Sequence, residues 1–340
     1  MTRKRSSAGV ERRAIEVGGS EIEPGQRQRI EIRVARFVTG EWVSLPVEVI
    51  HGAQPGPVVW MSGAIHGDEL DGVEIARVVS AGLSPAELRG TVFSIPIVNI
   101  FGFIQASRYL PDRRDLNRSF PGSAEGSMAG RLAWLFTTEI VDRSDWGIDL
   151  HCGSGERENL PQIRCDLTDP ETRAVAEAFS PALLIDNKGP EGSLRRVALE
   201  RGARVLVYEG GEAGRFTPAS IRSGIDGTLR MLHTLGMIDE APPAAAAPRK
   251  VSSTHWVRAS RSGIIRLDVE LGDEVRKGRK IGEITEILGG GQKVVRASNT
   301  GMVMGRRVSP LVYQGEALVH IARLDGGARE GSGDETRPDR

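Results

Sequence analysis

Three residues in this sequence have the types and the spacing of a zinc-binding site. His66 and Glu69 stand three positions apart in the stretch SGAIHGDELDGVEIARVV, and His151 ends the apolar stretch WGIDLH. Two imidazoles and one carboxylate are the ligands of a catalytic zinc ion whose fourth position is left open for water. A histidine and a glutamate at this spacing can face one point over the first turn of a helix. The pattern predicts one Zn²⁺ per chain and a hydrolytic enzyme.

Three residues close to these in the sequence can be interpreted as structural or supporting residues. Asp149 precedes His151 by two residues, so it points the same way along a strand and could accept a hydrogen bond from the imidazole. An Asp that is solvated or ion-paired explains it equally well. Cys152 is expected to pack on the opposite face, because successive strand residues alternate. Asp68 is expected to cap the helix that follows it.

The elements that must position these residues are apolar stretches that alternate with helical patterns. The expected buried strands are PVVWMSG, GTVFSIPIVN, DWGIDLH and ARVLVYE. Helical spacing is expected in the segments 68–83, 127–141, 169–180 and 217–237. This alternation predicts an α/β fold with a mostly parallel or mixed sheet that is flanked by helices on both faces.

Polar residues follow these strands at the point where each one ends. His66 and Glu69 come just after the first strand, Asn99 ends the second, His151 the third and Glu209 the fourth. Ligands of open α/β sheets bind outside the carboxyl ends of the strands. We therefore expect these side chains to meet at one edge of the sheet.

Hydrolysis also needs a group that transfers a proton to the leaving nitrogen. Glu209 ends a buried strand in LVYEGGEAGRF, and a carboxylate there is costly unless it is used or paired. We interpret it as a general base that later acts as the acid. A salt bridge to a nearby Arg is the alternative interpretation.

A cluster of cationic residues suggests an anionic substrate. The stretch SRYLPDRRDLNRSFPG contains Arg108, Arg113, Arg114, Asn117 and Arg118. The planar guanidinium of arginine binds carboxylates in a bidentate manner that lysine cannot match. Arg113 and Arg114 are expected to be solvated surface residues.

The N-terminal part of the chain divides by composition. Residues 1–28 are polar and weakly patterned and are predicted to form a flexible arm. Residues 29–240 are predicted to form the zinc hydrolase catalytic domain. At its start, apolar and polar residues alternate over residues 28–52, with a turn signal at Thr39-Gly40. This pattern predicts a β-hairpin.

The C-terminal part changes character at an Ala/Pro stretch, residues 241–250, which is predicted to be a stiff linker. Beyond it, VRASRSGII from Val257 and VRASNTGMV from Val295 repeat one short β-unit. Two such units predict a small pseudo-symmetric β-sandwich over residues 251–325. Residues 326–340 are Gly-rich and charged and are predicted to be disordered.

Composition excludes several classes of protein. Lys and Arg total 45 and Asp and Glu total 45, so no net basic field would recruit nucleic acid. Two cysteines, Cys152 and Cys165, suit a reducing compartment. No stretch approaches the roughly 20 apolar residues of a membrane helix. We expect a cytoplasmic protein without nucleic-acid or membrane partners, and the sequence leaves its oligomeric state open, homo-oligomers included.

Four stretches resemble, in order, the motifs of the succinylglutamate desuccinylase/aspartoacylase family, a branch of the zinc carboxypeptidase superfamily. They are GAIHGDE, SRYLPDRRDLNRSFPG, DLHCGSGERENLPQIR and VYEGGEAGRF, within residues 57 to 240. The resemblance implies a zinc-carboxypeptidase-like sheet. It implies that zinc is bound by His66, Glu69 and His151.

The resemblance also implies roles for residues outside the metal site. Glu209 would be the proton shuttle, and the substrate carboxylate and the scissile carbonyl would be contacted by Arg108, Asn117 and Arg118. Arg195, in SLRRVA, would be a further substrate-binding arginine. Tyr313, in PLVYQGEALVHIA, would enter the pocket from the second domain, although a core aromatic of the sandwich is an equal interpretation.

The resemblance implies a zinc amidohydrolase that removes the acyl group from a small anionic N-acyl amino acid. Alternatives with the same fold are a zinc carboxypeptidase that acts on small peptides and a non-catalytic zinc- or ligand-binding module. The repeated β-units also resemble biotinyl/lipoyl carrier domains of the barrel-sandwich-hybrid type. Lys293 lacks the flanking residues of a carrier lysine, so we reject a carrier function. The acyl group, the amino acid and the role of Arg164 are left open.

Overall fold

The computed structural model describes residues 12–36 and 38–325. Contacts divide the chain into two compact units. The first runs to Pro248 and includes residues 305–309, and the second holds the rest. The disorder predicted for residues 326–340, and for residues 1–11 of the arm, falls outside the described residues.

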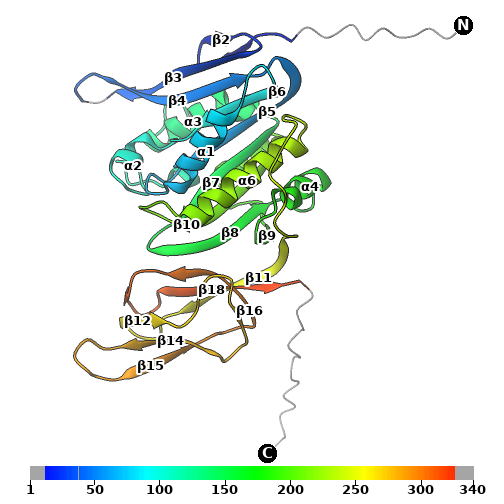
Figure 1. Ribbon diagram of the computed structural model, residues 1–340. Helices are drawn as coiled ribbons and strands as arrows, with labels where there is room; N and C mark the ends of the chain where they lie inside the picture. The colour runs from blue at the N-terminus through cyan, green and yellow to red at the C-terminus, as the bar shows by residue number, and fades with distance from the viewer. Residues whose placement is uncertain (1–11, 37, 326–340) are drawn as a thin grey trace, which may run out of the picture. The chain divides into compact units, whose positions relative to one another are not determined.

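The first unit is built on a mixed β-sheet (Figure 1). In spatial order its strands are β9 (Leu183–Asp186), β8 (Arg157–Cys165), β10 (Arg204–Glu212), β7 (Trp146–Gly153), β5 (Gln54–Gly63), β6 (Arg89–Ile95), β4 (Trp42–His51) and β3 (Gln26–Arg36). Strands β6, β5, β7 and β10 run parallel to one another, whereas β8 is antiparallel to β10. The carboxyl ends of β5, β7 and β10 therefore share one edge, as predicted.

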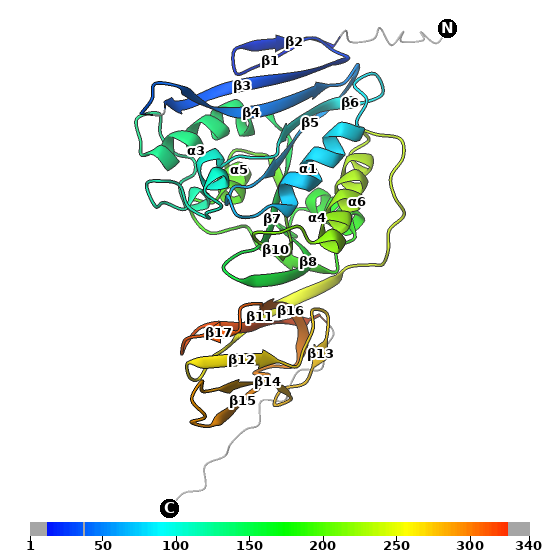
Figure 2. The ribbon, with the colours of Figure 1, turned by 60° about the vertical axis from the view of Figure 1, so that its left-hand side comes forward.

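Helices cover both faces of this sheet, as Figure 2 shows. One core packs the sheet against α1 (Asp71–Gly82), α4 (Pro170–Phe179) and α6 (Pro218–Thr234). The other core packs it against α3 (Met128–Glu139) and α5 (Leu194–Glu200). The short α2 (Ile100–Ile104) and two 3-10 turns, Leu116–Arg118 and Val141–Arg143, complete the helices of the described part. The α/β architecture predicted from the sequence is confirmed.

Alternation along β5 explains how one strand serves two cores. Val59 and Met61 enter the core of α1 and α6, and Trp60 enters the other. Trp60 is fully buried, and a Cβ added at Gly147 would lie 2.0 Å from its ring. Only glycine leaves room for this indole, whose truncation would cost about 3–5 kcal/mol.

The N-terminal segment is more ordered than predicted. β1 (Ile15–Val17) pairs with β2 (Ser20–Ile22), and β3 begins at Gln26, so the flexible arm predicted over 1–28 is wrong for these strands. The side chains of Val17 and Ile22 are fully buried, which anchors the segment in spite of its polar composition. The predicted hairpin of residues 28–52 is confirmed as β3 and β4.

The second unit consists of short strands around its own core. They are β11 (Arg249–Arg258), β12 (Gly263–Leu267), β13 (Glu274–Val275), β14 (Lys280–Thr285), β15 (Gln292–Arg296), β16 (Gly301–Arg307), β17 (Leu311–Val312) and β18 (Ala317–Leu324). The last residues of β16, from Gly305 on, belong to the first unit. The two repeats make equivalent contacts: Ala259 N–H donates to Glu316 O at 2.8 Å, and Ala297 N–H donates to Arg279 O at 2.9 Å. The alanine of each repeat therefore bonds to the residue that directly precedes β14 or β18 in the other repeat. This exchange supports the internal symmetry that the sequence predicts.

None of the described helices combines the length and the apolar composition that crossing a membrane requires.

Candidate zinc site and active site

His66, Glu69 and His151 meet at the carboxyl edge of the parallel strands. The Glu69 carboxylate lies between the two imidazoles, with Oε1 2.7 Å from His66 Nδ1 and Oε2 2.7 Å from His151 Nδ1. One ligand atom from each residue lies within 4.8 Å of the others. All three side chains are nearly inaccessible to solvent. In the described part of the chain, this is the one group of its kind that could hold a metal ion.

The loop between β5 and α1 positions two of these ligands. Glu69 N–H donates to His66 O at 3.1 Å, which closes a tight turn and turns both side chains toward β7. A Cβ at Gly67 would lie 1.9 Å from the Gly102 carbonyl carbon, so the loop packs against α2 in a way that only glycine permits. His151 is delivered by β7, two strand positions after Asp149.

A second carboxylate lies next to Nε2 of each imidazole, on the side away from Glu69. His151 Nε2 lies 2.8 Å from Asp149 Oδ2, and His66 Nε2 lies 3.2 Å from Asp115 Oδ1. Ser62 Oγ donates to Asp149 Oδ1 at 2.9 Å, which fixes that carboxylate in turn. An imidazole whose Nε2 donates to a carboxylate presents Nδ1 as a metal ligand. Asp149 takes the orienting position considered from the sequence, whereas Asp115 was missed.

The donor set fits zinc. Burial raises the pKa of Glu69, but the two adjacent imidazoles outweigh burial and hold its pKa below the ordinary value. The carboxylate is therefore ionised, as a ligand must be. Two imidazoles and one carboxylate make a three-ligand set typical of catalytic zinc.

Cys152 does not join this set, because the metal-binding group of the described residues omits it. Its side chain is buried, and burial raises the pKa of the thiol far above its ordinary value. Its backbone N–H donates to Glu69 Oε2 at 3.3 Å. Cys152 thus packs inside the fold and steadies Glu69 through its main chain.

Two polar residues near the strand ends have structural positions. The N-cap predicted for Asp68 is wrong: α1 begins at Asp71, after Leu70, and the cap position makes no side-chain hydrogen bond. The chain needs three more residues to turn from the metal-binding loop into the helix. Asn99 caps α2, where its side chain accepts a hydrogen bond from Gly102 N–H at 2.9 Å.

Arg108 lies beside the three metal-ligand residues. Its Nη1 lies 3.6 Å from Glu69 Oε1, and Nη2 donates to Asp115 Oδ2 at 2.8 Å. Nη1 also donates to Ser154 Oγ at 2.9 Å. The guanidinium is therefore pre-oriented with N–H donors next to the metal position.

Asn117 and Arg118 lie on the 3-10 turn after Asp115. Asn117 Oδ1 accepts a hydrogen bond from Leu194 N–H at 2.9 Å, so its carbonyl oxygen is engaged at the start of α5. Arg118 is exposed, and its Nη1 donates to Asn117 O at 2.6 Å. Arg113 and Arg114 are exposed as predicted. The substrate-binding roles of Asn117 and Arg118 remain predictions.

Glu209 neighbours His151 in the sheet, because β10 and β7 pair in parallel with these two residues in register. Its Oε2 accepts a hydrogen bond from Asn159 Nδ2 at 3.0 Å, and its Oε1 lies 3.4 Å from Arg164 Nη1. The salt bridge considered as the alternative therefore exists, and it coexists with a position next to the metal ligands.

Arg195 and Tyr313, the two other predicted substrate-binding residues, lie in different units and differ in burial. Arg195 is 7% exposed on α5, where Nη2 donates to Asn187 Oδ1 at 3.0 Å while Nε and Nη1 lack a hydrogen-bond partner. Burial and the nearby Arg164 lower its pKa to about 10. Tyr313 lies in the second unit, between β17 and β18, and is 74% exposed. Pocket roles for both remain predictions.

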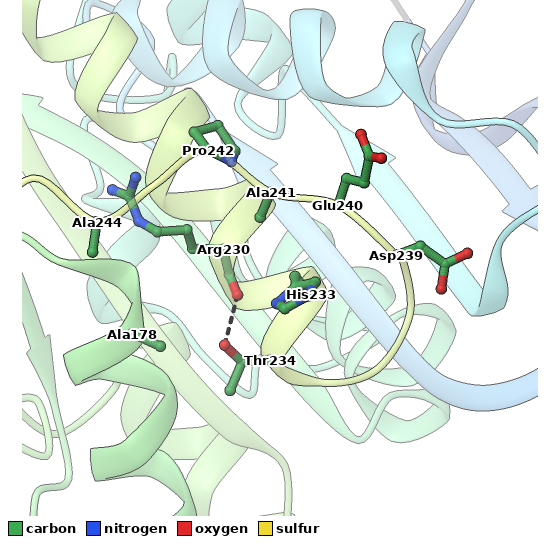
Figure 3. A pocket seen from close by; sticks show the side chains of 9 residues that line it. All are labelled: Ala178, Arg230, His233, Thr234, Asp239, Glu240, Ala241, Pro242 and Ala244. Atoms are coloured by element: carbon green, nitrogen blue, oxygen red, sulfur yellow. Dashed lines mark hydrogen bonds between the residues drawn. The ribbon is translucent and has the colours of Figure 1, made fainter.

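A separate hollow lies between α6 and residues 239–244 (Figure 3). Arg230 crosses it and donates from Nη1 to Pro243 O at 3.1 Å and from Nη2 to Phe179 O at 2.7 Å. None of the predicted site residues lines it. Arg230 therefore ties the first residues of the Ala/Pro segment to α4 and α6.

Comparisons with known proteins identify a family that the chain matches. The family model of the succinylglutamate desuccinylase/aspartoacylase catalytic domain matches residues 55–235, just over half of the chain. An N-alpha-acetyl-L-2,4-diaminobutyric acid deacetylase from Halomonas elongata is 28% identical over 296 residues, which cover 83% of this chain and 86% of the relative.

Solved structures show the same fold. A succinylglutamate desuccinylase/aspartoacylase from Rhodobacter sphaeroides has a TM-score of 0.81 and 25% identity, and the match covers 95% of this chain and 100% of that one. The product-bound ectoine utilization protein EutE (DoeB) from Ruegeria pomeroyi has a TM-score of 0.80 and 21% identity, with 93% and 97% covered. The chain belongs to the succinylglutamate desuccinylase/aspartoacylase family and is a hydrolase of amide carbon–nitrogen bonds.

Proposed function

We propose that this protein is a zinc-dependent deacylase that hydrolyses the amide bond of a small N-acyl amino acid. The observation that supports it best is the convergence of His66, Glu69 and His151, with both Nδ1 atoms turned to one ionised carboxylate. Family membership supports an amide substrate. Family membership shows a hydrolase of amide bonds. The bound zinc and the identity of the substrate are the parts that we propose.

Zinc held by these three residues would supply a water molecule activated near neutral pH and would polarise the scissile carbonyl. Arg108 offers N–H donors beside the three ligands for the negative charge that develops on the carbonyl oxygen. Glu209, beside His151 in the sheet, accepts a proton from the attacking water and gives it to the leaving nitrogen.

The substrate we propose first is an N-acetylated amino acid with a short polar side chain. This choice rests on the Halomonas elongata relative, whose name gives N-alpha-acetyl-L-2,4-diaminobutyric acid as its substrate. Arg195 would bind the α-carboxylate, because Nε and Nη1 of its buried guanidinium have no hydrogen-bond partner. Asn117 and Arg118, on the turn after Asp115, would contribute further contacts to the substrate.

Two other functions share this fold. A carboxypeptidase of small peptides would use the same ligands, and a binding module would use them without turnover. The deacetylase relative favours hydrolysis of an acyl group, and the pairing of a metal-ligand set with Glu209 favours catalysis.

A substrate screen of zinc-loaded protein tests the proposal. N-acetyl-L-2,4-diaminobutyrate and other N-acetyl, N-succinyl and N-formyl amino acids would be compared with dipeptides by kcat/KM. We expect an N-acyl amino acid to be preferred at least tenfold over any dipeptide, with activity lost to a chelator and restored by zinc. Preference for dipeptides, or full activity without metal, would refute it.

A further inference from the structure

Strand β8 supplies two contacts to the carboxylate of Glu209, one for each oxygen. Asn159 Nδ2 donates to Oε2 at 3.0 Å, and Arg164 Nη1 lies 3.4 Å from Oε1. Both residues come from a strand that pairs antiparallel with β10. The sequence patterns gave Asn159 no role and left that of Arg164 open.

A β-bulge explains why both side chains reach the same carboxylate. Gln162 pairs with Glu209 and Asn159 pairs with Gly211, so β8 advances three residues while β10 advances two. In a regular strand, positions 159 and 162 would point to opposite faces, because side chains alternate. The extra residue of the bulge brings Asn159 back to the face of Glu209.

Pro161 lies inside this bulge and gives it a physical cause. Proline has no N–H to donate to a ladder, so within sheets it occupies edges and bulges. The carbonyl of Pro161 accepts a hydrogen bond from Ala182 N–H at 3.1 Å. The stretch NLPQIR therefore specifies an irregular strand that redirects a side chain toward the active-site edge.

The two contacts orient Glu209 and still leave it free to react. Its side chain is 16% exposed, so the carboxylate is partly shielded from water. Each carboxylate oxygen has two lone-pair sites, and one contact per oxygen leaves one site on each to accept a proton. A hydrogen bond to a charged group shifts an equilibrium by roughly ten- to 150-fold, enough to hold one rotamer.

We propose that Asn159 is a positioning residue that fixes the Glu209 carboxylate for proton transfer, with Arg164 as its second support. This inference rests on the proposed role of Glu209. Arg164 makes the longer contact and lies near Arg195, so its removal would also change the charge around the substrate position. Asn159 is uncharged, which makes it the cleaner residue to test.

A double-mutant cycle with Glu209→Gln is the test. In zinc-loaded protein we expect Asn159→Ala to lower kcat by about ten- to a hundredfold with KM within twofold of wild type, because the group lost acts through Glu209. Asn159→Asp keeps the size but replaces the donor with an acceptor, and it should lose at least as much. In the Glu209→Gln background, Asn159→Ala should cost no further activity.

Glu158→Gln is the matched control on the same strand, since its carboxylate pairs with Arg306 at 3.2 Å and takes no part in the site. Its kcat should stay within twofold of wild type. A kcat for Asn159→Asp near that of wild type, or losses that multiply in the double variant, would overturn the positioning role. If Glu209→Gln itself stays active, the proposed catalytic role of Glu209 fails instead. Bound zinc and melting temperature identify a variant that has merely lost its fold.

Discussion

Replacing Asp149 by Asn should weaken zinc binding without disturbing the fold. The Asp149 carboxylate lies 2.8 Å from His151 Nε2 and accepts a hydrogen bond from Ser62 Oγ at 2.9 Å. An Asn at this position can accept from the imidazole with its oxygen and donate to the serine hydroxyl with its nitrogen. The substitution therefore removes a charge and keeps both hydrogen bonds.

The expected magnitude follows from the position of this carboxylate behind a ligand. Residues that orient a metal-bound imidazole typically contribute ten- to a hundredfold in metal affinity. The upper half of that range is expected here, because Asp149 and His151 are both buried and solvent does not screen the interaction. The loss is about 2–3 kcal/mol of zinc binding free energy.

Competition with a chromogenic chelator measures the zinc Kd of both proteins. Asp145→Asn is the control: its carboxylate accepts a hydrogen bond from Val58 N–H at 2.8 Å just before β7 begins, at the opposite end of that strand from His151. We expect a Kd at least 30-fold higher for Asp149→Asn and an unchanged Kd for Asp145→Asn. Equal zinc affinities for Asp149→Asn and wild type would refute the reasoning.

Three further predictions follow from single contacts. Glu209→Gln should bind zinc as wild type does but lower kcat at least a hundredfold, measured by steady-state kinetics with a zinc assay. Gly147→Ala should lower the melting temperature by about 4–8 °C, because its Cβ would stand 2.0 Å from the Trp60 ring. Hydrogen bonding from Thr172 and Arg204 lowers the pKa of Asp169 from 3.8 to about 2. The folded-state pKa is the lower one, so Asp169 stabilises the fold above pH 4. That stabilisation, about 1 kcal/mol after screening, is lost as the pH falls toward 2, and denaturation of Asp169→Asn against wild type measures it.

Each of these has a contradicting result. Wild-type turnover by Glu209→Gln would remove it from proton transfer. A Gly147→Ala melting temperature within 1 °C of wild type, roughly the precision of such a comparison, would show that the indole has room to move. A difference between Asp169→Asn and wild type that persists unchanged at pH 2 would show that the ionised carboxylate is not its source.

That the proposed metal ligands lie together could be predicted from the sequence, because ligands of α/β folds bind at the carboxyl ends of the strands. His66, His151 and Glu209 follow apolar stretches whose pattern is unambiguous, and their strands are parallel neighbours. Asp115 could not be paired with His66 in the same way. It is 49 residues away along the chain, in a loop, and no periodicity relates the two.

The elements that the patterns missed are short or irregular. β8 contains Pro161 and a bulge, so its residues do not alternate regularly, and the sequence patterns did not predict a strand there. α5 spans seven residues, too few for a helical period to stand out, and β9 spans four. β1 and β2 are three residues each and are held by the buried side chains of Val17 and Ile22. Tertiary contacts, rather than local pattern, specify all of these.

Zinc K-edge X-ray absorption of the zinc-loaded protein tests the central claim most directly. The proposed site predicts one zinc per chain, two imidazole nitrogens at about 2.0–2.1 Å, carboxylate oxygen at about 2.0–2.2 Å and no sulfur. A sulfur scatterer at about 2.3 Å would place Cys152 or Cys165 in the coordination shell and contradict the site. Retention of full zinc occupancy and an unchanged spectrum in His151→Ala would contradict it equally.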